Sequence, residues 1–541
     1  MDIHEWMGGD SAAIDEQLNS FSMKLHFNAS ARDFTESAYL PKGEFFIDDL
    51  HVGFEHYAHA LRKFHADVFI TETDFKVIDF SGFIDQSDFH FSGNLKHYDL
   101  WFLDHPFGST HLEYALTADK WQLKDLLGYK GWQYLPADYK AEELDHLVLK
   151  GRADLFFKDT LAAAQVEIVD CSGAIKAHHL NLDQLSLQLK WHDEVLDIED
   201  MEVKIGETDA SVGLRYHLGA SKGKGRDHLK LTSKKINFDQ LFQWQSSLVT
   251  SKEPTPSDVA YHDAGYNIYE IPFSDMDIDF SIGRLLYHQY DISQIRGDIT
   301  THRNHVVDIH NMHFTAAEGD FKMKGRLDGH QPDRIFMDSQ LQVDHVDLDR
   351  LLFKLDNFGQ DYLVSENVHG RASAVVDCHL PIHRDFTPIL EKAVVHVDWE
   401  VVDGKLENFE MLSALSDYFA DKNLSSIAFD TLQNHIDFTR GVLNIPSMSI
   451  LSSLGYLEIS GQQDMDFNMD YFIRVPWKMV TQAASSKIFG KGKEEAELNL
   501  EEDWREERDQ KKRKMIHLRV QGNLEQYKVS LQKERPKRRR V

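Results

Sequence analysis

The chain has 541 residues, of which 42% are hydrophobic and 11% aromatic, and this composition excludes a disordered protein. Asp and Glu outnumber Lys and Arg by 89 to 59, so the formal charge is −30. This negative charge argues against nucleic acid as a partner, because the phosphate groups of nucleic acid repel a negatively charged surface.

The N-terminal segment "MDIHEWMGGDSAAIDEQLNSF" does not show a basic region followed by an apolar run, which is the pattern of a secretory signal. No stretch of the sequence approaches the 18 or so apolar residues that a membrane-spanning helix requires. We therefore expect neither an anchor nor a signal in this sequence. The two distant cysteines, Cys171 and Cys378, predict neither a disulfide framework nor a metal site.

Alternation of apolar and polar residues dominates from about residue 22 to 475 and predicts β-strands. The chain has only 12 prolines, which suits a protein made mostly of paired strands, because proline interrupts a ladder. Strand-like segments in chain order include "SMKLHF" (22–27), "HLEYALTA" (111–118), "HLKLTS" (228–233), "VVHVDWEVV" (394–402) and "NHIDFT" (434–439).

A weak repeat runs through these strands. An alternating strand followed by a short helical turn occurs three times, anchored at Leu123, Phe238 and Leu348, which are 115 and 110 residues apart. A second pattern precedes it at "DFHFSGNL" (88–95) and "DFKMKGRL" (320–327), with "TDASVGLRY" (208–216) as a looser copy. It recurs near the C-terminus at "YLEISG" (456–461). We predict a recurring module of roughly 110–120 residues. Chance similarity among amphipathic strands is the alternative.

The segment "TSKEPTPSDVAYHDAG" is polar, contains two prolines and marks a linker. We predict an N-terminal β-repeat half at 1–249, a linker at 250–267, a second β-repeat segment at 268–400 and a distinct C-terminal region at 401–533. Inside the last region we predict helices near 408–422 and 477–490 and a charged insertion at 494–514, and a basic tail follows at 534–541.

The predicted helix at 477–490 begins after Pro476 and has two interpretations. It either caps one end of the sheet or lies on a lipid surface. The basic tail at 534–541 is by default a plain solvated tail, and its alternatives are contact with anionic lipid head groups and a nuclear import signal. The candidate end-cap or membrane-surface residues are Trp477, Lys478, Val480, Ala484, Lys487 and Ile488.

The segment "MDFNMDYFIRV" (465–475) alternates over eleven residues and predicts one long strand. An apolar face of this length needs a covering layer or a ligand.

Motifs that indicate catalysis or phosphate binding are scarce in this sequence. The sequence contains no Gly-x-Ser-x-Gly or His-Glu-x-x-His motif, and "GASKGKG" (219–225) favours a turn over a phosphate loop.

The densest histidine group, "THRNHVVDIHNMH", matches no specific set of metal ligands. We therefore expect no catalytic residue, no metal, no cofactor and no enzymatic activity.

The segment 401–476 contains, in order, "DGKLENF", a predicted helix, "IAFDTL", "GVLNIPSMSILSS" and "LEISG". In this order of features it resembles the C-terminal region of AsmA-like proteins. The close "MDYFIRVPWKMVTQAASSKIFGKG", the charged stretch and "LRVQGNLEQYKVSL" are similar to members of this family from the Bacteroidetes group. The match covers roughly 401–531, and the upstream repeats fit the family more loosely.

The resemblance implies a periplasmic envelope protein, related to TamB-like proteins, that is anchored in the inner membrane in the full-length family. It implies an elongated, curled antiparallel β-sheet that forms a hydrophobic groove, with a few short helices. The implied function is transport of phospholipid between the inner and outer membranes, which supports outer-membrane integrity. The implied partners are phospholipid acyl chains and the inner-membrane surface or membrane proteins. The alternative function is a β-rich scaffold or assembly factor for outer-membrane proteins that conducts no lipid.

On this interpretation the apolar sides of the repeated strands line the groove. The candidate groove residues are Phe89, Phe91, Phe321, Met323, Leu457, Ile459, Met465, Phe467, Met469, Tyr471, Ile473 and Val475.

Overall fold

The computed structural model of the protein describes the strands and most of their connections. The described residues are 18–30, 32, 40–54, 61–123, 142–176, 179–218, 225–241, 268–270, 273–287, 290–354, 366–384, 388–407, 426–453, 455–476, 515–523 and 526–532. The predicted linker, charged insertion and basic tail, and the predicted helices near 408–422 and 477–490, lie outside them.

The protein is mainly β, as predicted, and its described residues form 25 strands, which build an open, curled sheet in each of the two units described below. Every strand pairing that the structure describes is antiparallel except that of β12 (Asp227–Asn237) with β13 (Met276–Tyr287), which is parallel. The predicted fold class is therefore confirmed.

The chain divides into two compact units. Unit 1 comprises Met1–Ser251 and Asp275–His288, and unit 2 comprises Lys252–Ser274 and Gln289–Val541. Because β13 pairs with β12, it belongs to unit 1 although it follows the predicted linker. The domain boundaries predicted from the sequence stay predictions.

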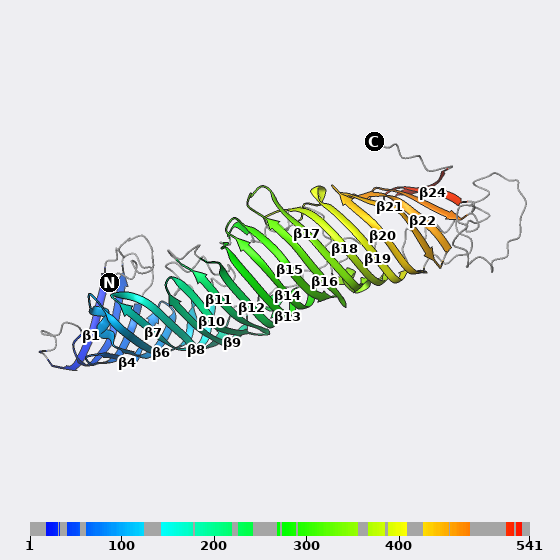
Figure 1. The fold of residues 1–541 in the computed structure, drawn as a ribbon. Coiled ribbons are helices and arrows are strands. Elements are labelled where there is room, and N and C mark those ends of the chain that lie inside the picture. The colour runs from blue at the N-terminus through cyan, green and yellow to red at the C-terminus, as the bar shows by residue number, and fades with distance from the viewer. Residues whose placement is uncertain are drawn as a thin grey trace, which may run out of the picture. The chain divides into compact units, whose positions relative to one another are not determined.

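Unit 1 contains thirteen described strands (Figure 1). Besides β12 and β13 they are β1 (Leu18–Ala29), β2 (Gly43–Phe54), β3 (Leu61–Ile70), β4 (Asp74–Ile84), β5 (Ser87–Lys96), β6 (Phe107–Gln122), β7 (Glu143–Lys158), β8 (Thr160–Ile175), β9 (Leu180–His192), β10 (Val195–Ile205) and β11 (Thr208–His217). Its described helices are the 3-10 turn η1 (Tyr98–Phe102) and the short α4 (Phe238–Leu241).

Unit 2 contains twelve described strands. They are β14 (Tyr290–His302), β15 (Val306–Ala316), β16 (Gly319–Asp328), β17 (Ile335–Asp347), β18 (Val368–Ile382), β19 (Val394–Glu407), β20 (Ser426–Thr439), β21 (Val442–Ser452), β22 (Gly455–Asp464), β23 (Met469–Pro476), β24 (Met515–Gly522) and β25 (Tyr527–Gln532). Its described helices are α5 (Leu348–Lys354) and the 3-10 turns η6 (Ile268–Glu270) and η8 (Leu390–Lys392).

The repeat predicted from the sequence corresponds to a structural unit. All three anchor residues begin a helical turn directly after a strand, since Leu123 follows β6, Phe238 opens α4 and Leu348 opens α5. In each case the second sequence pattern forms the preceding hairpin partner, namely β5, β11 and β16. The module is thus a hairpin whose second strand ends in a helical turn.

Side-chain contacts at the hairpin ends also repeat. The Ser87 hydroxyl accepts a hydrogen bond from the backbone N–H of Gln122 at 2.9 Å, and the Thr208 hydroxyl accepts one from Asn237 at 3.0 Å. Both donors are the last residue before a helical turn. The hydroxyls therefore hold the point at which each strand changes to a helix.

Bulges and glycines account for the curvature of the strands. His146 and His345 have positive φ angles of 54° and 52° and lie at register shifts in β7 and β17. Such bulges bend a strand and increase its twist. At Gly151 an added Cβ would lie 2.5 Å from Tyr114 Oη, and at Gly461 it would lie 2.5 Å from Tyr471 Cδ1. Both glycines therefore make room for an aromatic ring on the same face.

The strand predicted at 465–475 is shorter than its alternation suggests. β22 ends at Asp464 and β23 begins at Met469, and the residues between them form a turn. The Asp464 carboxylate accepts hydrogen bonds from the Asn468 backbone N–H and side-chain amide, both at 2.9 Å. Phe467 has a φ of 59° in this turn, and Met465 is exposed. Local hydrogen bonding by Asp and Asn has overridden the alternation.

Candidate functional site

Unit 1 carries a continuous row of apolar side chains on one face of its sheet. Ten residues, one from each strand from β4 to β13, are paired directly across successive strands. We call this row the unit 1 ladder, and it consists of Phe75, Leu95, Leu112, Ala153, Val166, Leu189, Ile198, Leu214, Leu229 and Ile278.

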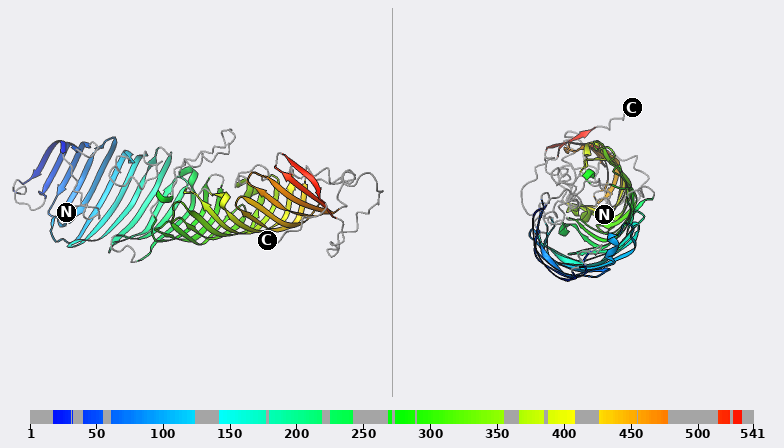
Figure 2. Two further views of the ribbon diagram at one scale, coloured as in Figure 1. Left: turned by 90° about the horizontal axis from the view of Figure 1, so that it is seen from above. Right: turned by 90° about the vertical axis from the view of Figure 1, so that its left-hand side faces the viewer.

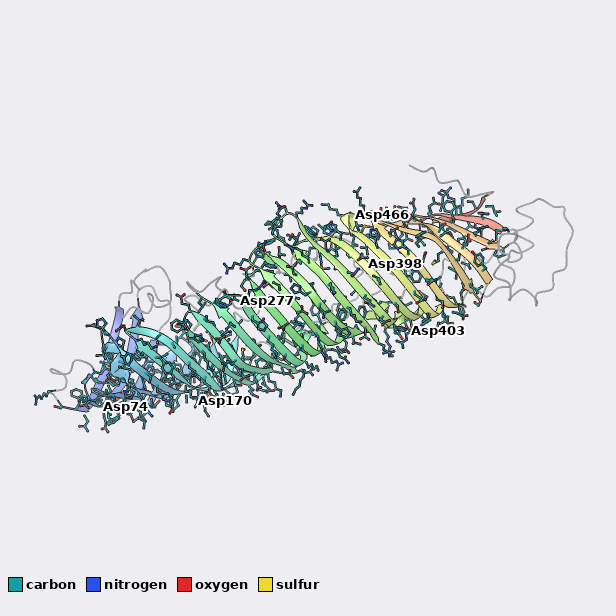
Figure 3. The ribbon with its side chains drawn as sticks, in the orientation of Figure 1. Asp74, Asp170, Asp277, Asp398, Asp403 and Asp466 are labelled. Atoms are coloured by element: carbon teal, nitrogen blue, oxygen red, sulfur yellow. The ribbon has the colours of Figure 1, made fainter. Side chains whose placement is uncertain are left out.

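The neighbouring row points to the opposite face and is polar. It includes Glu113, Arg152, Glu167 and Gln188, again in register across β6 to β9. Arg152 and Glu167 form an ion pair on that face. Because side chains alternate along a strand, the sheet of unit 1 has one apolar face and one polar face. Figure 3 shows the side chains on the strands and labels Asp277 and Asp398, which lie opposite His228 and His435 on neighbouring strands.

All ten ladder residues are half-buried, and none reaches full burial. In a β-sandwich the facing sheet would bury such a row. The described strands all belong to one sheet, so no second sheet of described residues packs on the ladder. Over the middle of the strands, the described part of unit 1 therefore leaves its apolar face partly open.

Short helices cover the apolar face near the strand ends instead. In unit 1, the Tyr98 ring of η1 lies 6.1 Å from the ring of Phe75. In unit 2, Leu351 of α5 packs beside the buried Phe321. In Figure 2 the strands of each unit curve around the side on which these helices lie. The apolar face is therefore the concave face.

Unit 2 repeats the arrangement over six strands, β15 to β20. Its row of paired residues, the unit 2 ladder, is also half-buried throughout. It consists of Met312, Met323, Leu341, Val376, Val397 and Ile436. The same pattern thus arises independently in both units.

Toward β25 the apolar face of unit 2 changes from half-buried to closed. Leu518 is 1% exposed and Val475 is fully buried. They belong to one core cluster, the C-terminal core, which consists of Val401, Ile427, Phe429, Leu432, Ile450, Leu457, Met469, Val475, Ile516, Leu518 and Val520. This part of the face has the burial of a packed protein core.

The predicted groove residues of β22 and β23 therefore separate into two sets. Leu457, Met469 and Val475 are buried in the C-terminal core. Ile459, Tyr471 and Ile473 are half-buried and pack against it. Burial raises the pKa of Tyr471 to about 12, and its hydroxyl donates a hydrogen bond to Gln463 Oε1 at 2.8 Å. Tyr471 is therefore neutral and held in place at pH 7.

The predicted groove residues of β5 and β16 also lie on the apolar face. Phe89 is buried in a cluster with Phe64 and Phe80, whose rings lie 5.4 and 5.2 Å from it. Phe321 is buried beside Phe314, with a ring separation of 4.8 Å. Phe91 is half-buried, as is Met323 in the unit 2 ladder. Phe89 and Phe321 thus support the wall from within, while Phe91 and Met323 are available for contact.

The remaining predicted groove residues, Met465 and Phe467, lie in the turn after β22 rather than on a strand. Most ladder residues were missed from the sequence because every amphipathic strand offers several apolar positions. Only the pairing register identifies which of them align across the sheet.

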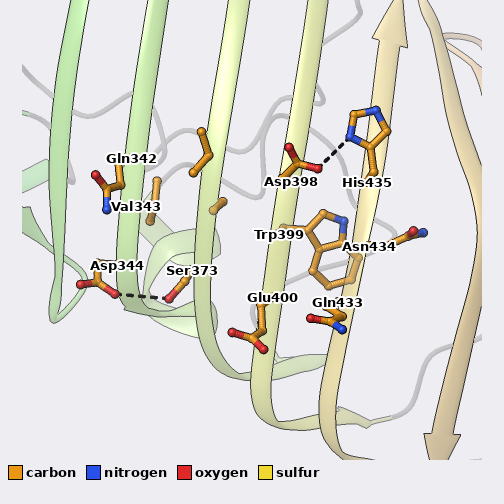
Figure 4. Close-up of a pocket in the computed structure, with 12 residues that line it drawn as sticks. Gln342, Val343, Asp344, Ser373, Asp398, Trp399, Glu400, Gln433, Asn434 and His435 are labelled. Carbon is orange, nitrogen blue, oxygen red and sulfur yellow. Dashed lines mark hydrogen bonds and ion pairs between the residues drawn. The ribbon is translucent and has the colours of Figure 1, made fainter.

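A pocket of about 500 Å³ lies on the polar face of β17 to β20 (Figure 4). Its lining includes Asp344, Asp398, Glu400, Gln433 and His435. The lining also contains Val375 and Trp399, but a hydrocarbon chain placed here would remove water from the carboxylates of the lining, so the pocket does not suit such a chain. The half-buried apolar ladders on the opposite face are the better candidate for a functional site.

Comparison with protein-family models, with curated proteins and with solved structures found no match for this chain. Among the described residues, no helix has the length and apolar character needed to cross a membrane.

Proposed function

We propose that the protein is a non-enzymatic carrier whose concave apolar face binds the acyl chains of phospholipids. The observation that carries the proposal is the half-buried state of all ten side chains of the unit 1 ladder. Together with the resemblance of 401–531 to AsmA-like proteins, it supports a periplasmic protein that moves phospholipid between the inner and outer membranes and maintains outer-membrane integrity.

The chemistry of the ladders suits hydrocarbon without selecting a head group. Strands lie about 4.8 Å apart, so ten of them present an apolar row on the order of 40 Å long. Each methylene removed from water contributes roughly 0.8 kcal/mol, so an acyl chain is held by many small, nonspecific contacts. Neither ladder contains a charged residue. A lipid can therefore shift along the row without breaking a specific interaction.

The proposal predicts that the protein purifies with phospholipid. We expect the full chain, isolated without detergent, to yield at least one phospholipid per molecule after solvent extraction and mass spectrometry. Delipidated protein should regain lipid from vesicles. A preparation that carries no phospholipid and takes up none from vesicles would contradict the carrier and favour the scaffold or assembly factor.

The connection from η1 to the start of β6, which we call the η1–β6 loop, supports contact with a bilayer as the source of lipid. Large apolar side chains are exposed at Trp101, Phe102, Leu103 and Phe107, the last of these to 79%. The Trp101 indole donates a hydrogen bond to Thr110 Oγ1 at 3.0 Å, which holds the loop against β6. Exposed groups of this kind mark membrane or protein contacts, and aromatic side chains are favoured at the membrane interface.

Replacement of both Phe102 and Phe107 by Ser should weaken binding to phosphatidylcholine vesicles at least tenfold, because burial of one such side chain contributes about 1.5–3 kcal/mol. Flotation with vesicles measures this binding. Leu451→Ser is the matched control, since Leu451 is 61% exposed but lies in β21 of unit 2. Equal loss in the control, or unchanged binding of the double variant, would exclude this loop as the contact.

A further inference from the structure

Two histidines and two aspartates form a compact group on the polar face of unit 2. In the antiparallel pairing of β19 with β20, His396 lies opposite Asp437 and Asp398 lies opposite His435. Residues two apart on a strand point to the same face. The four side chains therefore occupy the corners of a quadrilateral in which the two histidines are diagonal.

The side chains converge on one carboxylate oxygen. Asp437 Oδ1 lies 2.6 Å from His396 Nδ1 and 2.9 Å from His435 Nε2. The two imidazole rings are nearly parallel, at an angle of 11°, and their centroids are 6.2 Å apart. One candidate ligand atom from each of His396, His435 and Asp437 lies within 4.8 Å of the other two. Small side-chain rotations could bring all three to a common point.

A second carboxylate orients one of the histidines. Asp398 Oδ1 lies 2.9 Å from His435 Nδ1, as Figure 4 shows. A proton on Nδ1 that is donated to Asp398 leaves the lone pair of Nε2 directed toward Asp437. Metal-bound histidines commonly have such a carboxylate partner, which fixes the tautomer and raises the basicity of the ligand nitrogen.

The surroundings of the group favour a cation. On β18, Asp377 lies opposite His396, and on β21, Asn444 lies opposite Asp437. Glu400 follows on β19 and lines the same polar pocket as Asp398 and His435. These cross-strand and same-strand neighbours add negative charge or neutral oxygen atoms and no positive charge.

We propose that His396, His435 and Asp437 form a binding site for a divalent transition-metal ion of the zinc class. Two imidazoles and a carboxylate are ligands typical of zinc, whereas calcium and magnesium prefer oxygen ligands alone. On binding, each imidazole coordinates the ion through the nitrogen that faces Asp437. Any proton on that nitrogen moves to the other ring nitrogen or is released to solvent, and water completes the coordination. The site lies on the face opposite the ladders and is independent of the proposed lipid function.

The sequence did not indicate this site, and we expected no metal from it. His396 and His435 are 39 residues apart and meet only through strand pairing. Among the described residues, the histidine–aspartate contact between His379 and Asp338 lies on the same face, across β17 and β18 at 2.6 Å. His379 lines a neighbouring pocket with His396 but does not belong to the three-ligand group. That pair therefore provides a matched control.

Isothermal titration of the chelator-treated full chain with zinc chloride tests the proposal. We expect one zinc site of highest affinity per molecule. Its affinity should fall at least tenfold in His435→Gln and in Asp437→Asn, and it should be unchanged in His379→Gln. Asp398→Asn, which removes only the orienting carboxylate, should also weaken the site about tenfold. Thermal unfolding without metal should be similar in all variants, because the side chains are partly exposed.

The proposal is overturned if the wild-type chain shows no zinc site tighter than those of the His435→Gln and Asp437→Asn variants. It is also overturned if His379→Gln weakens zinc binding as much as they do. Lipid content is expected to be the same in every variant and with or without zinc, so failure of the metal site and failure of the lipid carrier are distinguishable.

Discussion

Replacement of Leu518 by Ala is expected to lower the free energy of unfolding of unit 2 by about 3 kcal/mol, because large-to-small substitutions at fully buried sites cost roughly 2–5 kcal/mol. Leu518 is 1% exposed and lies in the C-terminal core, between Ile473 of β23 and Leu531 of β25. The shortened side chain loses its contacts and leaves a cavity that the other buried residues of the C-terminal core can fill only in part.

Urea unfolding followed by hydrogen exchange of peptides from β24 measures this change within unit 2. Leu531→Ala is the matched control, since Leu531 lies directly opposite Leu518 but is 38% exposed. We expect the control to cost less than about 1 kcal/mol, because much of its apolar surface is already in contact with water. Equal costs at the two positions would show that this end of the sheet is not closed.

Replacement of Leu189 and Leu214 by Asp is expected to remove bound phospholipid almost completely while the fold is retained. These residues flank Ile198 in the unit 1 ladder, on β9 and β11. A carboxylate next to an acyl chain must lose water without gaining a partner, which costs several kcal/mol. Because each 1.4 kcal/mol changes affinity tenfold, lipid content should fall by more than an order of magnitude.

The matched control for this variant carries the same two charges on the same two strands. Gln184 and Ser211 lie on β9 and β11, are exposed and point to the polar face. The double variant Gln184→Asp, Ser211→Asp should keep its lipid. Circular dichroism should show the same strand content in both double variants. Global unfolding of the ladder variant alone would instead indicate that the ladder is part of a dry core.

Much of the fold could be predicted from the sequence because its signals are local. Period-two alternation specifies strands wherever one face is apolar. The helical turns at Phe238 and Leu348 could be predicted from their recurrence at a fixed distance from an alternating strand. These features depend only on neighbouring residues and on the spacing between copies.

Features that depend on pairing could not be predicted in the same way. Met465 and Phe467 occupy every second position in line with the apolar residues of β23, so the sequence assigns them to the same strand. The Asp464–Asn468 hydrogen bonds instead place them in a turn. Nothing in "MDYFIRV" distinguishes a groove wall from the closed core in which Met469 lies, since burial there depends on the neighbouring strands. The histidine group at β19 and β20 likewise exists only through the register.

Site-specific photocrosslinking in cells tests most directly the central claim that the concave apolar face binds lipid. A photoreactive amino acid at Leu341 lies in the unit 2 ladder, and one at the adjacent Gln342 points to the polar face of the same strand. Mass spectrometry of the irradiated, purified chain should detect phospholipid adducts at position 341 and none at position 342. Absence of adducts at position 341, or equal adducts at both positions, would contradict the lipid groove.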